Sequence, residues 1–227
     1  MLYKTHGIVL RFVKYGETSI IVTIYTEEFG LSSFIVNGVR SSRSKGKIAL
    51  FQPLSILDLV VYHKEGRNIN RLSEVKCLDP LNDLRSNIIK SSLGMFIVEV
   101  LNKCIKEETP NEPLFRYIID SIKVLNELNS DYENFHLVFL LKLSKFLGFA
   151  SQNAAEFYRD IQAVSSSSAG THNKTIDALI GNGFGTKMKI TAPTRASILN
   201  DILLFYHVHM DLPELNSVKI LHTILND

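Results

Sequence analysis

The segment GIVLRFVKYGETSIIVTIYTEEFGLSSFIV, residues 7–36, decides the fold of the N-terminal part of the chain. It contains three largely apolar runs, at 7–14, 19–26 and 31–36, of which the second is rich in β-branched residues. Tyr15-Gly16-Glu17 and Glu28-Phe29-Gly30 separate the runs. A glycine in each connection can adopt the positive φ that a tight turn requires. The pattern therefore predicts three short strands joined by tight turns.

Two further strands are predicted downstream, at 54–63 and 70–78, with a turn at Lys64-Glu65-Gly66-Arg67 between them. Five short strands within about 80 residues are typical of a small barrel or sandwich. A five-stranded barrel of this size fits an OB-fold, and closure of the barrel removes exposed strand edges. Other small barrels fit the same number of strands.

After residue 80 the apolar positions adopt helical spacing, so the predicted fold class is α+β: an OB-fold β-barrel at 1–80 and a helical bundle domain at 81–227. Helices are predicted near 84–100, 113–128, 132–147, 193–209 and 214–225. The helix at 132–147 is apolar around most of its circumference, which predicts a central, buried position, and Gly148 is its candidate C-terminal cap. Residues 150–175 lack periodicity and are predicted to be a flexible insert, with the linker-like SSSSAG at 165–170.

A basic segment, VRSSRSKGK at 39–47, follows the third strand. It carries Arg40, Arg43, Lys45 and Lys47 without a carboxylate, which favours binding of a polyanion such as DNA. Residues 1–80 hold 11 Lys/Arg against 7 Asp/Glu, whereas residues 81–227 hold 14 against 16, so the positive charge lies in the N-terminal part. The same loop composition also suits an ordinary solvated loop.

Composition and motifs exclude several classes of protein. Hydrophobic content of 45% and charged content of 21% are typical of a soluble globular protein, and no apolar run reaches the roughly 20 residues of a membrane span. The N-terminus lacks a signal-peptide layout, and Cys77 and Cys104 cannot build a disulfide framework, so we expect a cytoplasmic protein. Phosphate-binding, metalloprotease, hydrolase and dinucleotide motifs are missing, so we expect no catalytic residue, metal or cofactor.

Nucleic-acid binding is better supported, because the predicted β region carries further cations at Lys4, Arg11 and Lys14. OB-folds that bind single strands combine a basic groove with aromatic rings on which bases stack, at about 1–3 kcal/mol per base. Most aromatic residues of this region are expected in the core. Tyr3, Tyr15 and Phe29 lie near turns or the chain start and are the candidate stacking residues.

The order of several short motifs resembles a known family. They are GIVL (7–10), YGETS (15–19), YTEEFGL (25–31), NGVR (37–40), SK (44–45), LFQPL (50–54), KFLGF (145–149) and LNSVKIL (215–221). Together with the change from β to α periodicity near residue 80, they resemble the bacterial recombination mediator RecO family over nearly the whole chain.

The resemblance implies an OB-fold domain, a helical bundle and a non-enzymatic role in recombinational repair at the nucleoid. Members of the family bind single- and double-stranded DNA, anneal complementary strands, contact the C-terminal tail of single-strand-binding protein, and work with RecR to load RecA. The segment 40–47 looks like one associated with DNA contact in the family. The sequence leaves open whether RecF takes part.

Two features depart from the family pattern. Asn37 stands where the family usually has a lysine, which removes one expected phosphate contact. Many members carry a four-cysteine zinc module after the Leu-Gly-Phe motif, but residues 150–185 contain no cysteine. We therefore expect no zinc module in this chain.

Lys142 and Lys145 interrupt the apolar helix predicted at 132–147. A lysine on such a helix must reach either solvent or a partner. The tail implied by the resemblance is acidic and ends in an apolar residue, so its acceptor needs an apolar groove with a cation at the rim. The two lysines are therefore candidate contacts for that peptide, and ordinary exposure of the amino groups is the alternative. For the whole protein, the alternative function is a protein adaptor whose barrel does not touch DNA.

Overall fold

A computed structural model of the chain describes residues 1–41, 44, 46–64, 66–163 and 171–226. Contacts group the chain into two compact units: Met1–Asn82 with Val98–Ile122, and Asp83–Ile97 with Lys123–Asp227. The segment Val98–Ile122 thus belongs with the N-terminal unit although it lies beyond residue 80. The division into functional domains at 1–80 and 81–227 stays a prediction. Among the described residues, no helix is both long and apolar enough to cross a membrane.

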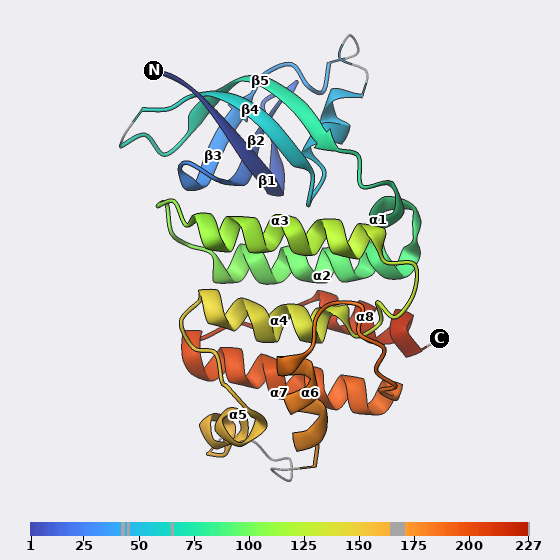
Figure 1. Cartoon of the computed structure of the whole chain (residues 1–227). Helices are drawn as coiled ribbons and strands as arrows, with labels where there is room; N and C mark the ends of the chain where they lie inside the picture. Colours follow the sequence, from blue (N-terminus) through green and yellow to red (C-terminus); the bar gives the residue numbers. More distant parts are fainter. Residues whose placement is uncertain (42–43, 45, 65, 164–170, 227) are drawn as a thin grey trace. The chain divides into compact units, whose positions relative to one another are not determined.

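Five strands form a closed barrel in the order β1-β2-β3-β5-β4 (Figure 1). They are β1 (Leu2–Tyr15), β2 (Ser19–Thr26), β3 (Gly30–Val36), β4 (Ile56–Tyr62) and β5 (Asn70–Asp79). Neighbouring strands are antiparallel except β3 and β5, which pair in parallel. The closed barrel followed by helices confirms the predicted fold class.

Strand β1 begins five residues earlier than predicted, because Leu2–Gly7 pair with Leu57–Tyr62 of β4. This part of β1 carries Lys4 and His6 and has no apolar run, so its local sequence gave no strand signal. A β-bulge between Val9 and Arg11 interrupts the pairing of β1 with β2. A bulge bends the strand and increases its twist, which helps one strand pair with two neighbours around a small barrel.

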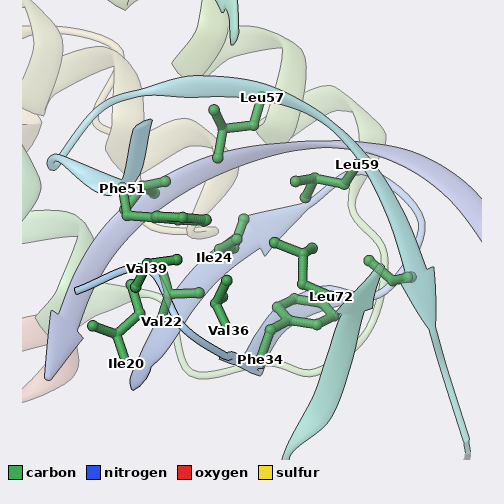
Figure 2. Close-up of a cluster of buried hydrophobic side chains, with 12 residues drawn as sticks. Ile20, Val22, Ile24, Phe34, Val36, Val39, Phe51, Leu57, Leu59 and Leu72 are labelled. Atoms are coloured by element: carbon green, nitrogen blue, oxygen red, sulfur yellow. The ribbon is translucent and has the colours of Figure 1, made fainter. Parts of the chain in front are cut away.

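The barrel interior is filled by alternate residues of the strands, shown in part in Figure 2. The cluster comprises Val9, Ile20, Val22, Ile24, Phe34, Val36, Val39, Phe51, Leu57, Leu59, Val61 and Leu72. Gly7 faces this interior, where a Cβ atom would lie 2.5 Å from Ile24 Cγ2 and 2.8 Å from Leu59 Cδ1. A residue without a side chain is therefore required at that point of β1.

The outer face of β1 and β2 is covered by the end of α2 (Ile88–Cys104) and the beginning of α3 (Glu112–Glu127), both of which belong to the same unit. The Asn102 side-chain amide donates to the Leu10 carbonyl at 3.1 Å, and the Tyr25 and Phe115 rings lie 6.0 Å apart. Leu10 and Tyr25 are buried in consequence. Because both faces of these strands are buried, their sequence is apolar in runs and does not alternate strictly.

In the second unit, α4 (Phe135–Phe146) is central, as predicted, and nine of its residues are buried. It packs against α6 (Asn173–Gly181) and α7 (Ala192–Met210), and α7 also contacts α5 (Ala154–Ile161) and α8 (Ser217–Asn226). Gly148 has φ 88°, and the amide of Phe149 donates to the Ser144 carbonyl at 3.0 Å. This arrangement is a Schellman cap, so the predicted role of Gly148 is confirmed.

The prediction that residues 150–175 lack structure was wrong for its two ends. Helix α5 occupies Ala154–Ile161, and α6 begins at Asn173. Asn153 caps α5 by accepting a hydrogen bond from the amide of Glu156 at 3.0 Å. The buried residues Ala154, Phe157, Tyr158 and Ile161 have helical spacing, but eight residues give a weak periodic signal. The serine-rich segment 165–170 lies outside the described residues.

Candidate nucleic-acid interface

Arg40 is held against the β1–β2 turn by its backbone and its side chain. Its amide donates to the Thr18 carbonyl at 2.9 Å, and Nη1 donates to the carbonyls of Gly16 at 3.2 Å and Ser19 at 3.5 Å. The guanidinium is therefore fixed in position, and part of its donor capacity is used within the protein. Asn37 also braces this end of the barrel, because its Oδ1 accepts from Ser19 Oγ at 3.2 Å.

The basic loop has local order where the structure describes it. The hydroxyls of Ser41 and Ser44 donate to the Gly38 carbonyl at 2.8 and 2.6 Å. Gly46, with φ 87°, precedes the 3₁₀ helix η1 (Lys47–Phe51), whose Phe51 is buried in the barrel core. Lys47 is exposed, whereas Arg43 and Lys45 lie outside the described residues.

The three predicted cations of β1 are exposed but do not form one patch with the loop. Lys14 pairs with Ile20 beside the β1–β2 turn, at the end of the barrel where Arg40 is anchored. Arg11 pairs with Thr23 in the middle of β2, and Lys4 pairs with Val60 of β4. Because a strand rises about 3.3 Å per residue, Lys4 and Lys14 can be up to about 33 Å apart along β1.

The three candidate stacking residues likewise lie at two different ends of the barrel. Tyr15 is exposed at the end of β1. Tyr3 and Phe29 meet at the other end of the barrel, with ring centroids 5.4 Å apart and their planes at 79°. Phe29 is in turn stacked on His63, at 4.1 Å between centroids and an interplanar angle of 12°.

This aromatic group borders a cavity of about 320 Å³ between the first half of β3 and the β4–β5 loop. Arg11, Lys64 and Arg67 line it together with Phe29 and His63. The sequence alone does not indicate His63, Lys64 and Arg67 as site residues. The turn at 64–67 was predicted, but nothing local indicated that it would lie beside Arg11.

Within the helical unit, the Lys142 amino group lies 6.0 Å from the centroid of the Phe184 ring, and Lys145 is exposed on the same helix. An apolar groove of about 410 Å³ occurs elsewhere in this unit, between α7 and α8. Leu203, Leu204, Leu215 and Val218 line it, with Lys219 beside them. Neither Lys142 nor Lys145 lines that groove. No cluster of three or more potential metal ligands occurs in the described part of the chain.

Comparison with known proteins relates the chain to one protein family. The family model of the recombination protein O N-terminal domain matches residues 1–81, which contain the whole barrel, and that of the C-terminal domain matches residues 85–154. The chain is also 34% identical over 243 residues to the DNA repair protein RecO of Azobacteroides pseudotrichonymphae, with the full length of both proteins covered. The chain belongs to the RecO family.

Other RecO proteins show the same likeness. That of Flavobacterium johnsoniae is 33% identical over 222 residues, with 93% of each chain covered. That of Phocaeicola vulgatus is 45% identical over 148 residues, which cover 65% of this chain and 61% of the relative. The match to RecO proteins thus extends through α7 and α8, beyond the region of the two family models. The RecO resemblance drawn from the short motifs is confirmed.

Proposed function

We propose that this chain is a non-enzymatic recombination mediator in DNA repair. It binds single- and double-stranded DNA, anneals complementary strands and, with RecR, helps to load RecA onto DNA coated by single-strand-binding protein. Family membership supports this role, and the observation that supports DNA contact most directly is the carboxylate-free basic loop at one end of the closed barrel. The protein acts in the cytoplasm, at the nucleoid. RecF stays a further candidate partner.

DNA binding at the loop works mainly through neutralisation of phosphates by Arg40, Arg43, Lys45 and Lys47. Lys14 supports the loop from the same end of the barrel, whereas Arg11 and Lys4 extend the positive surface along β1. A cationic surface lowers the repulsion between two strands, and contacts to phosphates leave the base edges free to pair. Annealing of complementary strands follows from these two properties.

Replacing Arg40 and Arg43 by alanine is expected to flatten the salt dependence of single-strand binding. Four phosphate contacts give a slope of log affinity against log salt of about −3, at roughly 0.7 per contact, and removing two leaves about −1.5. Fluorescence anisotropy at four salt concentrations measures this slope. The double variant Arg71→Ala, Lys76→Ala removes the same charge from exposed positions of β5 and should lower the slope less. An unchanged slope in the loop variant would show that Arg40 and Arg43 do not contact the DNA phosphates.

Arg40 hydrogen-bonds the β1–β2 turn, so its replacement also affects the stability of the barrel. The melting temperature of the loop variant is therefore compared with that of wild type. The pair Arg43→Ala, Lys45→Ala removes two charges from the loop without touching that brace. The two loop variants should therefore show the same change in salt slope. A change confined to the Arg40 variant would indicate a structural effect and not lost phosphate contacts.

We infer that the helical unit binds the acidic C-terminal tail of single-strand-binding protein through Lys142 and Lys145. Replacing either by alanine is expected to weaken binding of a labelled tail peptide about fivefold, because an exposed charge-assisted hydrogen bond is lost. Anisotropy titration of the peptide against both variants checks this. Lys219→Ala serves as the comparison, since Lys219 borders the apolar groove between α7 and α8. Equal affinity of wild type and both α4 variants excludes those lysines, and a loss confined to Lys219→Ala assigns the tail to the groove.

A further inference from the structure

The cavity of about 320 Å³ lies on the barrel beside the β2–β3 turn, whereas Arg40 of the basic loop is anchored at the β1–β2 turn. Strand β3 pairs with β5 only at Phe34 and Ile35, so the first half of β3 has no β5 neighbour. The β4–β5 loop, which carries Lys64 and Arg67, borders the space left beside it.

Three cations line the cavity, Arg11 from β1 and Lys64 and Arg67 from the β4–β5 loop. Within the described part of the chain, none of their side chains forms a hydrogen bond or an ion pair. Glu108 is the one carboxylate among the described lining residues. Cations gathered around a concave surface raise the local concentration of anions, so the cavity favours a negatively charged ligand.

One wall of the cavity is aromatic. Phe29 and His63 form a parallel stack there, and the Tyr3 ring meets both of them edge-on, at 5.4 and 6.3 Å between centroids. Aromatic rings beside a basic surface are the combination with which proteins hold the bases of single-stranded nucleic acid. A wall of this kind suits a nucleotide better than inorganic phosphate or a carboxylate, which offers no ring to stack.

The buried side chain of Asn70 fixes the loop that carries the cations. Its Oδ1 accepts from the Lys64 amide at 3.1 Å, and its Nδ2 donates to the Arg67 carbonyl at 3.5 Å. The same Nδ2 lies 3.4 Å from His63 Nδ1. The backbone at Lys64 and at Arg67 is therefore held in place before a ligand arrives, which reduces the entropy lost on binding.

We propose that this cavity is a subsite for one unpaired nucleotide of a DNA strand, with a phosphate beside the cations and the base against the Phe29–His63 wall. The inference rests on the proposed DNA-binding function and adds the preference for single strands. The volume is at the lower end of the roughly 300–1,000 Å³ of small-ligand sites. A base inside a duplex is stacked and paired, and it can enter such a pocket only after extrusion. The basic loop contacts phosphates of either form, whereas the cavity selects the single strand.

Three labelled oligonucleotides of equal length test the proposal: a thymidine strand, an abasic strand with the same phosphates, and a duplex. Wild type is expected to bind the abasic strand about tenfold more weakly than the thymidine strand, because base stacking is lost. Arg67→Gln is expected to weaken thymidine-strand binding about fivefold and duplex binding less than about twofold. Arg71→Gln, a matched loss of charge on the barrel outside the cavity lining, should weaken both to the same small extent.

The variant His63→Ala removes part of the aromatic wall and leaves Arg11, Lys64 and Arg67 in place. We expect this variant to bind the thymidine strand and the abasic strand with similar affinity.

Equal binding of these two strands by wild type would overturn the subsite, as would an equal loss of single-strand and duplex binding in Arg67→Gln. Free thymidine monophosphate is expected to compete weakly, and competition as strong as that of the strand would assign the cavity to a free nucleotide. If DNA binding depends on Arg40 and Arg43 but not on Arg67 or His63, the subsite is overturned and the proposed function stands. If the protein does not bind DNA at all, the proposed function is overturned as well.

Discussion

Replacing Gly30 by alanine is expected to lower the free energy of unfolding by about 3 kcal/mol. Gly30 starts β3 with φ 61°, a conformation that costs an alanine about 1–2 kcal/mol. A Cβ atom at this position would also overlap the backbone carbonyl of Thr109, which cannot rotate away as a flexible side chain could. Next to it, the Leu31 amide donates to the Glu107 carbonyl at 3.0 Å. The segment around Thr109 would have to move away from the β2–β3 turn.

Gly38→Ala is the matched control for this prediction. Gly38 has φ 72°, but no atom lies within 4 Å of the position that a Cβ atom would occupy, so the variant reports backbone strain alone, at about 1 kcal/mol. Urea denaturation at 25 °C measures both variants. The difference between them reports the packing of residues 107–109 on the barrel, and equal destabilisation would show that this packing does not exist in solution.

Acidification from pH 7 to pH 4.5 is expected to lower the free energy of unfolding by about 2.5 kcal/mol through His136 alone. Burial lowers the pKa of this imidazole to about 3, and the positive charges of Arg195 and His222 act in the same direction against the smaller effect of the Glu133 backbone. Neither ring nitrogen has a partner of good hydrogen-bond geometry among the described residues, so the Glu133 backbone offsets little of this effect. The unfolded chain takes up a proton below a pKa of about 6.5, whereas the native state stays neutral. The stability present above pH 6.5 is therefore lost as the pH falls towards 3.

His136→Phe separates this effect from the titration of carboxylates, which also contributes to acid unfolding. The substitution keeps an aromatic ring beside Phe96, whose centroid lies 5.9 Å from that of His136, and it removes the proton-binding site. Its unfolding free energy, measured by urea at pH 7 and pH 4.5, should fall with pH by about 2.5 kcal/mol less than that of wild type. The same pH dependence in both proteins would mean that His136 is not buried in its neutral form.

The elements that the sequence predicted well are those whose signal is local. Strand β2 is rich in β-branched residues, both β2 and β3 are bounded by turn residues, and α4 is a long apolar helix with Gly148 at its end. The start of β1 was missed because its pairing with β4 spans more than fifty residues of sequence. Helix α5 was missed because it is only eight residues long.

The candidate site was predicted only in part for the same reason. The charge of Arg40 was evident, but its hydrogen bonds to Gly16 and Ser19 depend on the closure of the β1–β2 turn against the loop. Lys64 and Arg67 were assigned to a turn, and only the closed barrel brings them to the cavity that Arg11 lines. No local pattern carries that information, because the residues meet through the order of the strands.

The salt dependence of wild-type binding to a single strand shows directly whether the barrel binds DNA through its cations. We expect a slope of log affinity against log salt of about −3, with annealing of a complementary oligonucleotide under the same conditions. An absence of salt-sensitive DNA affinity would contradict it. The barrel would then be the protein-binding module of an adaptor.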